Sequence, residues 1–260
     1  MICFGLPFLR RFAVLLCLLW AWPAQAGHIR IAAAADLKFA MDAVLASFHK
    51  DHPADVVDVV YGSSGQFQTQ IEQGAPYDLF FSADIAFPQA LATAGLAASP
   101  VRAYAVGRIV LWSASQDASR MTLASLADPA IQRIAIANPK HAPYGRRAEA
   151  ALRAAGLWQK VEAKLVYGEN IAQAAQFVQT GNAQVGIIAL SLALSPELAS
   201  RGRYGTIPES LYPALEQGYI LTRQARDNPL AGQFADYIGS PAARDILTRC
   251  GFVLPDRPAP

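Results

Sequence analysis

Short apolar runs alternate with helical patterns along most of the chain. The runs, each bounded by turn or capping residues, occupy residues 28–35, 56–61, 77–84, 132–138, 163–168 and 183–190. Amphipathic stretches lie between them, and the first of these places Leu37, Met41 and Val44 on one helical face. Strands that alternate with helices through short connections predict parallel sheets covered by helices on both faces.

Two longer extended stretches, residues 103–115 and 215–223, interrupt this alternation. We expect them to connect two lobes as a two-strand hinge, and the helical patterns after residue 229 to return to the first lobe. The sequence therefore predicts an α/β protein of two lobes, each with a mainly parallel sheet flanked by helices. Lobe one is predicted at residues 27–107 and 216–260, and lobe two at residues 108–215.

Residues 1–26 have the pattern of a secretion signal. Arg10 and Arg11 precede an apolar run that is short for a membrane span, and Ala24-Gln25-Ala26 forms a small-x-small cleavage site. Removal of this segment takes the formal charge from +2 to zero. A neutral chain has no charge excess that would attract nucleic acid or an anionic membrane. We therefore expect an exported protein that binds neither.

The cysteines carry little of the expected structure. Cys3 and Cys17 lie in the predicted signal, so Cys250 has no partner for an internal disulfide. A zinc site made of cysteines is excluded for the same reason. We expect Cys250 to be a small buried residue of the last helix.

Four strand-to-helix junctions carry the candidate chemistry. They are Ala35-Asp36, Gly62-Ser63-Ser64-Gly65, Ala142-Pro143-Tyr144-Gly145 and Glu169-Asn170-Ile171. In open α/β sheets, ligands bind beyond the carboxyl ends of the strands, where helix N-termini present free backbone N–H groups and a partial positive charge. Small residues and a serine hydroxyl at such a start favour an anion held by neutral donors. Ordinary helix capping is the alternative for each junction taken alone.

Several blocks together resemble a known family. They are "IRIAAAADLKFAMDAV", "YGSSGQFQTQIEQGAPYDLFFSAD", "VGRIVLW", "IAIANPKHAPYG" and "GFVLP". From about Ile29 to Leu254 they resemble, in order, the periplasmic molybdate-binding proteins of ABC importers. The resemblance implies the two-lobed periplasmic binding protein fold (type II) and a periplasmic monomer that is not an enzyme. Such a protein captures molybdate or tungstate between its lobes, needs no cofactor or free metal cation, and delivers the anion to a membrane permease driven by an ATPase.

The family's ligand positions correspond to four residues of this chain. They are Asp36 after the alanine run, Ser64 in the Gly-Ser-Ser-Gly turn, Tyr144 in Ala-Pro-Tyr-Gly, and Ile171, the last through its backbone N–H. Many members add a tyrosine where this chain has Ala189, although a branch of the family lacks it.

Asp36 departs from the family pattern, because many members have serine there and a carboxylate repels a dianion. Three interpretations stay open. Asp36 caps its own helix, which we favour because Asp is a good N-cap; it is protonated in the closed cleft; or the ligand is a different oxyanion.

Other functions remain as alternatives. Another tetrahedral oxyanion such as phosphate or sulfate would use similar donors. More distantly, Ser64, His141 and Asp36 could form the triad of a serine hydrolase, although the G-x-S-x-G elbow is absent. His49 and His52 could suggest a metal site but lack a third ligand nearby. Arg146 and Arg147 could draw anions to the mouth of the cleft, although a charged outer helix face is the usual explanation for such a pair.

Overall fold

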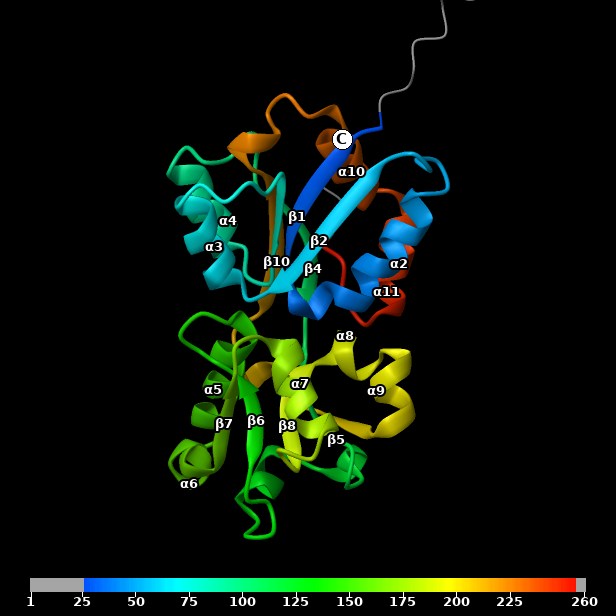
Figure 1. The fold of residues 1–260 in the computed structure, drawn as a ribbon. Helices are drawn as coiled ribbons and strands as arrows, with labels where there is room; N and C mark the ends of the chain where they lie inside the picture. Colours follow the sequence, from blue (N-terminus) through cyan, green and yellow to red (C-terminus); the bar gives the residue numbers. More distant parts are fainter. Residues whose placement is uncertain (1–25, 256–260) are drawn as a thin grey trace, which may run out of the picture.

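Two five-stranded sheets organise the chain, one in each of two lobes (Figure 1). The computed structural model describes residues 26–255. The predicted secretion signal, with Cys3 and Cys17, lies outside the described residues except for Ala26. Among residues 26–255, no helix combines the length and the apolar character that crossing a membrane requires.

The strands are β1 (His28–Ala34), β2 (Val56–Gly62), β3 (Leu79–Ser82), β4 (Arg102–Gly107), β5 (Ile109–Ser113), β6 (Ile134–Ala137), β7 (Leu165–Gly168), β8 (Val185–Ala189), β9 (Arg203–Thr206) and β10 (Leu215–Leu221). The α-helices are α2 (Lys38–Phe48), α3 (Ser64–Glu72), α4 (Ala86–Thr93), α5 (Pro143–Ala154), α6 (Trp158–Val161), α7 (Ile171–Gln179), α8 (Leu190–Ala193), α9 (Pro196–Arg201), α10 (Pro229–Ile238) and α11 (Pro241–Arg249). Short 3₁₀ helices are η2 (Ala35–Leu37), η3 (Ala118–Arg120), η4 (Leu123–Ala127), η5 (Glu162–Lys164), η6 (Glu209–Leu211) and η7 (Arg223–Ala225).

Both sheets are mixed. The first has the order β2-β1-β3-β10-β4 and the second β7-β6-β8-β5-β9. The strands that alternate with helices pair in parallel, as predicted: β1 with β2 and β3, and β6 with β7 and β8. By contrast, β10 is antiparallel to β3 and β4, and β5 is antiparallel to β8 and β9. The antiparallel strands flank the two passages of the chain between the sheets.

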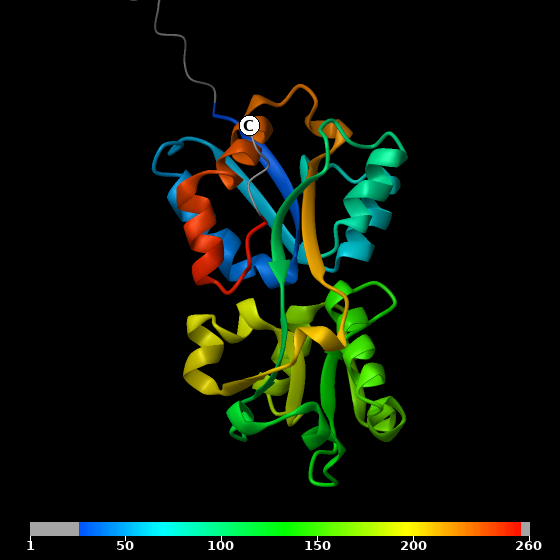
Figure 2. The same ribbon diagram turned by 180° about the vertical axis from the view of Figure 1, so that it is seen from behind.

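The stretch over residues 103–115 is not the single strand that the pattern predicted. It breaks at Arg108, so that β4 joins the first sheet and β5 joins the second. The chain returns between β9 and β10, and Figure 2 shows both passages running from one lobe to the other. These two passages form the two-strand hinge.

In the first lobe, helices cover both faces of the sheet. Alternate residues of β1 point to opposite faces, so Ile29 and Ile31 pack with α2, α10 and α11, whereas Ala32 packs with α3 and α4. The predicted return of the C-terminal helices to this lobe is confirmed, because α10 contacts β1 and α11 contacts α2. Cys250 follows α11 as its C-cap and is half-buried.

The second lobe has its own core, in which α5 and α7 pack against the buried strands β6 and β8. The carboxyl ends of β1 and β2 lie opposite those of β6 and β7, at the boundary between the lobes (Figure 1). This boundary is where the four predicted junctions lie.

Candidate functional site

All four junctions line one small cavity between the lobes. The cavity has a volume of about 10 Å³, room for about one water molecule. Its walls are Ala34, Ala35, Asp36, Gly62, Ser63, Ser64, Ala83, Ala142, Pro143, Tyr144 and Ile171. The structure therefore brings together the four residues that the resemblance singled out, Asp36, Ser64, Tyr144 and Ile171.

Three helices begin at this cavity. Ser63 is the N-cap of α3, Ala142 of α5 and Asn170 of α7. The first N–H groups of a helix have no intrahelical partner and carry the positive end of the helix dipole. These N-termini supply partial positive charge at a cavity whose lining residues include no lysine, arginine or histidine and one carboxyl group, that of Asp36.

Ser64 is oriented as a hydrogen-bond donor. Its side chain is fully buried, and its Oγ accepts a hydrogen bond from the backbone N–H of Ala83 at 3.0 Å. A hydroxyl group has one proton, and an Oγ that accepts from one side directs this proton elsewhere. The Ser64 hydroxyl can therefore donate to a ligand in the cavity.

Asp36 lies at the centre of a buried hydrogen-bond network. Its Oδ2 accepts hydrogen bonds from the Tyr144 hydroxyl at 2.9 Å and from Gln217 Nε2 at 2.8 Å. Gln217 Oε1 in turn accepts from the Tyr104 hydroxyl at 2.6 Å. The other carboxylate oxygen, Oδ1, is buried and has no hydrogen-bond partner among the described residues. The network joins η2 of the first lobe to α5 of the second.

The expectation that Asp36 caps its helix is wrong. Ala34 occupies the N-cap position of η2, and no side chain forms a capping hydrogen bond there. The carboxylate instead accepts hydrogen bonds from Tyr144 and Gln217, which lie on α5 and β10 and pack over it. Their chain positions are remote, so the local sequence around Asp36 gave no sign of them.

Burial raises the pKa of Asp36 to about 6. Hydrogen bonds from Gln217 and Tyr144 offset part of this shift. The backbone N–H of Asp36 also lowers the pKa, although it forms no hydrogen bond of normal geometry to Oδ1. Burial likewise raises the pKa of Tyr104 and Tyr144 well above the usual value of a tyrosine, with the Asp36 charge adding to the shift. Both phenols are therefore neutral donors at physiological pH.

A second set of contacts closes the cleft beside the cavity. The backbone N–H of Gly65 donates to the His141 carbonyl at 3.0 Å, and Ser63 Oγ lies 2.9 Å from His141 Nδ1. Glu169 Oε2 accepts from Gln66 Nε2 at 2.9 Å and lies 3.4 Å from His141 Nε2. The contacts of Ser63, Gly65 and Gln66 join the start of α3 to junctions of the second lobe, whereas the contact between Glu169 and His141 lies within the second lobe.

The predicted hydrolase triad is not formed. His141 contacts Ser63 and Glu169, whereas Ser64 Oγ accepts from Ala83 N–H and Asp36 binds Tyr144 and Gln217. A base that takes the proton of a nucleophile must lie within hydrogen-bond reach of it. The arrangement therefore does not support Ser64 as a nucleophile.

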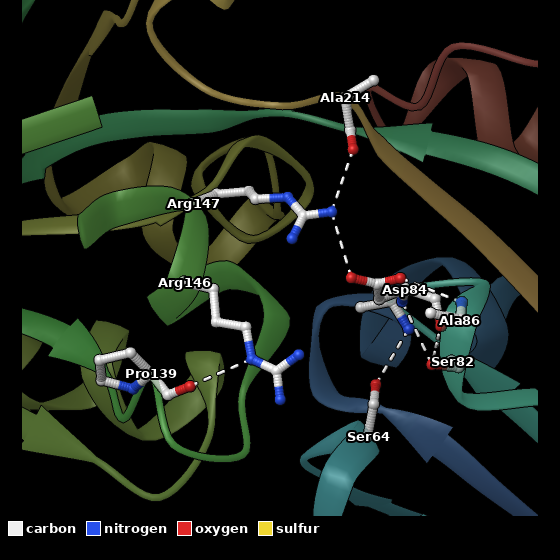
Figure 3. A network of polar contacts seen from close by, with 9 residues as sticks. Ser64, Ser82, Asp84, Ala86, Pro139, Arg146, Arg147 and Ala214 are labelled. Carbon is white, nitrogen blue, oxygen red and sulfur yellow. Dashed lines mark hydrogen bonds and ion pairs between the residues drawn. The ribbon is translucent and has the colours of Figure 1, made fainter. Parts of the chain in front are cut away.

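The expectation that Arg147 lies on an outer helix face is wrong, because this residue lies in the contact between the lobes. Its Nη2 lies 3.1 Å from Asp84 Oδ2 and also donates to the Ala214 carbonyl (Figure 3). Arg146 stays nearby, with its Nε donating to the Pro139 carbonyl and its guanidinium 5.1 Å from the Phe87 ring centre. Both arginines are occupied by protein partners and do not reach the cavity as free cations.

The two histidines at the end of α2 form no metal site. His49 Nδ1 lies 3.3 Å from the His52 carbonyl, and His52 Nδ1 lies 3.1 Å from Asp55 Oδ2. Within residues 26–255, no three histidine, cysteine, aspartate or glutamate side chains gather as metal ligands.

The sequence analysis missed Gln217 and Tyr104. Gln217 is fully buried within strand β10, next to the exposed Glu216. A polar residue at a buried strand position could have indicated a hydrogen-bonded role for Gln217, because buried polar groups are nearly always hydrogen-bonded.

Comparison with known proteins identifies the family of the chain. Residues 29–253 match the family described as bacterial extracellular solute-binding protein. The chain is 37% identical to a molybdate-binding protein of Azotobacter vinelandii over 91% of this chain and 94% of that protein. It is 35% identical to a molybdate-binding protein of Rhodobacter capsulatus, over 90% of this chain and 91% of the relative.

Solved structures agree on the architecture. The periplasmic molybdate-binding protein of Azotobacter vinelandii superposes with a TM-score of 0.81 at 31% identity, over 88% of this chain and all of that chain. A sulfate-binding protein of Mycobacterium tuberculosis superposes with a TM-score of 0.75 at 16% identity, covering 89% of this chain and 88% of its own, and shares the fold alone. With its two hinged lobes and matching sequence, this chain belongs to the bacterial extracellular solute-binding protein family, as a relative of the molybdate-binding proteins.

Proposed function

We propose that this protein captures molybdate, and tungstate similarly, between its two lobes outside the cytoplasm and delivers the anion to an ABC importer. One observation carries the proposal: four strand-to-helix junctions from both lobes line one enclosed cavity. Neutral donors at helix N-termini suit a fully ionised tetrahedral dianion. The relatives named as molybdate-binding proteins, matched over nine-tenths of the chain, support this cargo.

Each proposed ligand residue has a part. Ser64 donates through its hydroxyl, and Tyr144 and Ile171 donate through the free backbone N–H groups of α5 and α7. The Tyr144 hydroxyl is already engaged with Asp36, so the Tyr144 side chain positions the carboxylate. We place lobe one at residues 27–107 and 216–260, of which 256–260 lie outside the described residues, and lobe two at residues 108–215. Donors from both lobes converge only when the cleft closes, which couples binding to hinge motion.

Export is part of the proposal, with processing between Ala26 and Gly27. The backbone nitrogen of Gly27 lies 2.7 Å from Asp55 Oδ1, and its carbonyl accepts from the N–H of Val56. Cleavage at this point would turn the Gly27 nitrogen into an ammonium group and the hydrogen bond into an ion pair. Outside the cytoplasm, the protein acts as a monomer that presents its closed form to the permease and ATPase of the importer, with no catalysis of its own.

Thermal unfolding of residues 27–260, freed of ligand by unfolding and refolding, tests the proposal. Molybdate, tungstate, chromate, sulfate and phosphate are compared at equal concentration. A ligand that binds only the folded state stabilises it by mass action, by about 4 kcal/mol at a thousandfold excess over the dissociation constant. We expect a large rise of the unfolding temperature with molybdate and tungstate alone. A rise with phosphate or sulfate instead would assign another cargo, and no rise with any anion would refute oxyanion capture.

A further inference from the structure

We propose that Asp36 takes up one proton from solvent when the anion binds, so that the cleft closes with a neutral carboxylic acid donating a hydrogen bond to the anion through Oδ1. This inference rests on the proposed function and deepens it. It makes anion capture by this chain a proton-coupled event, with the proton added to Oδ1 and no bond of the anion broken.

The hydrogen bonds of Asp36 determine which oxygen takes the proton. Oδ2 already accepts from Tyr144 and Gln217, which occupies its two lone pairs. Oδ1 is buried without a partner, in a residue that lines the cavity. A proton on Oδ1 needs an acceptor, and no described residue provides one. An oxygen of a bound anion would satisfy both groups at once.

Electrostatic repulsion between Asp36 and the anion also favours protonation of Asp36. A carboxylate and a dianion in one small, enclosed cavity repel strongly, because the surroundings screen charges far less than water does. A neutral acid removes this repulsion and adds a donor. A carboxyl group with a pKa of about 6 is ionised at neutral pH in the free protein. The nearby dianion then raises this pKa further, so binding above pH 6 draws in a proton.

Within residues 26–255, no other charged group in contact with Asp36 competes for this role. Its titratable neighbours are Tyr144 and, through Gln217, Tyr104, and both are neutral phenols at physiological pH. The remaining ionisable side chains near the cleft have partners of their own in the protein. Arg147 pairs with Asp84, Lys38 with Asp42 and Arg108 with Glu209, His141 Nε2 lies 3.4 Å from Glu169 Oε2, and Arg146 donates to the Pro139 carbonyl.

Titration calorimetry of molybdate binding at pH 7.5, in buffers of different ionisation enthalpy, counts the protons taken up. We expect about one proton per molybdate for the unmodified protein. The affinity should fall as pH rises from 6.5 to 8.5, approaching tenfold per pH unit. Asp36→Asn should bind molybdate with no proton uptake and no such slope. Asp51→Asn removes an exposed carboxylate on the same lobe and should behave like the unmodified protein.

The outcomes separate this inference from the proposed function. Molybdate binding by the unmodified protein without proton uptake would overturn the inference alone, as would full proton uptake by Asp36→Asn. Absence of molybdate binding would overturn the proposed function and the inference with it. Infrared difference spectra of the unmodified protein need no variant. They should show a protonated carboxylic acid carbonyl band appearing with molybdate, and a spectrum without that band would count against the inference.

Discussion

The guanidinium of Arg147 lies 3.1 Å from the carboxylate of Asp84, and this ion pair joins the two lobes across the closed cleft. Only 14% of the Arg147 side chain and 13% of the Asp84 side chain are exposed. Asp84 is held in place on its own lobe because its Oδ1 accepts from the N–H of Ala86 (Figure 3). An opened cleft would hydrate both charges separately. The pair therefore acts on the equilibrium between open and closed forms.

Arg147→Met should weaken molybdate binding by about 10–100-fold, or roughly 1.5–3 kcal/mol. The substitution leaves the Asp84 carboxylate buried without its partner whenever the cleft closes, and an unpaired buried charge is costly. Titration calorimetry at constant pH measures the change. Asp84→Asn in the same background should restore part of the loss, because the unpaired charge is then gone.

Arg153→Met is the matched control on the same helix. Arg153 pairs with Glu149 at the surface, and exposed ion pairs contribute little. Its affinity should stay within about twofold of the unmodified protein. If Arg147→Met behaved like this control, the ion pair across the cleft would have no part in closure.

Gly65→Ala should weaken anion binding without destabilising the fold. A Cβ at Gly65 would lie 2.7 Å from the His141 carbonyl oxygen and 3.1 Å from its Cα, both in the opposite lobe. Backbone atoms cannot yield as a flexible side chain does, so the lobes must stay further apart. Gly65 has no positive φ and lies within α3, where alanine is the better helix former. We expect at least tenfold weaker molybdate binding by calorimetry, and an unfolding temperature of the ligand-free protein that does not fall.

Gly232→Ala provides the comparison. Gly232 lies in α10, and a Cβ there would meet no atom within 4 Å. This variant should gain stability and keep the affinity of the unmodified protein. Equal affinity of the Gly65 and Gly232 variants would show that the contact between Gly65 and His141 does not limit closure.

The sequence predicted the fold and the convergence of the four junctions because both follow from local patterns. Alternating apolar runs and helical faces indicate the succession of strands and helices along the chain, and carboxyl ends of parallel strands meet at one edge of a sheet. Short segments without such periodicity, such as β9 and α8, were not predicted. The break at Arg108 was missed because apolar residues lie on both sides of it, in β4 and in β5.

The contacts of the site were less predictable because they join distant parts of the chain. Asp36 meets Gln217 across 181 residues and Tyr144 across 108. The face of α5 that carries Arg147 looks like a solvent-exposed face until the other lobe is placed against it. Side-chain partners across a closed cleft depend on how the lobes meet, and no local pattern encodes that.

Ser64→Ala should weaken molybdate binding by about 10–100-fold. The hydroxyl is directed toward the cavity by the Ala83 N–H, and hydrogen bonds to charged groups contribute about 1.5–3 kcal/mol. Thr93→Ala is the control, because its exposed hydroxyl donates within α4 to the Gln89 carbonyl. Calorimetry on both variants should show a loss for Ser64→Ala alone. An unchanged affinity in Ser64→Ala would remove this hydroxyl from the proposed site.

Asp36 should also make the stability of the ligand-free protein depend on pH. Its pKa is about 6 in the folded protein, against 3.8 for the unperturbed group. The folded state therefore binds the proton more tightly. This favours folding below about pH 4, and the contribution is lost as pH rises through about 6. The difference between the two pKa values corresponds to at most about 3 kcal/mol.

Asp36→Asn should remove this dependence. Its amide oxygen can still accept from Tyr144 and Gln217, and no charge is buried at any pH. We expect the variant to be more stable than the unmodified protein at pH 7.5, by up to about 3 kcal/mol, with the advantage shrinking toward pH 4. Urea unfolding at several pH values measures it, with Asp51→Asn as the exposed control. A constant difference between Asp36→Asn and the unmodified protein from pH 4 to 8 would mean that the carboxyl group titrates alike in the folded and unfolded chain. Burial would then not govern its charge.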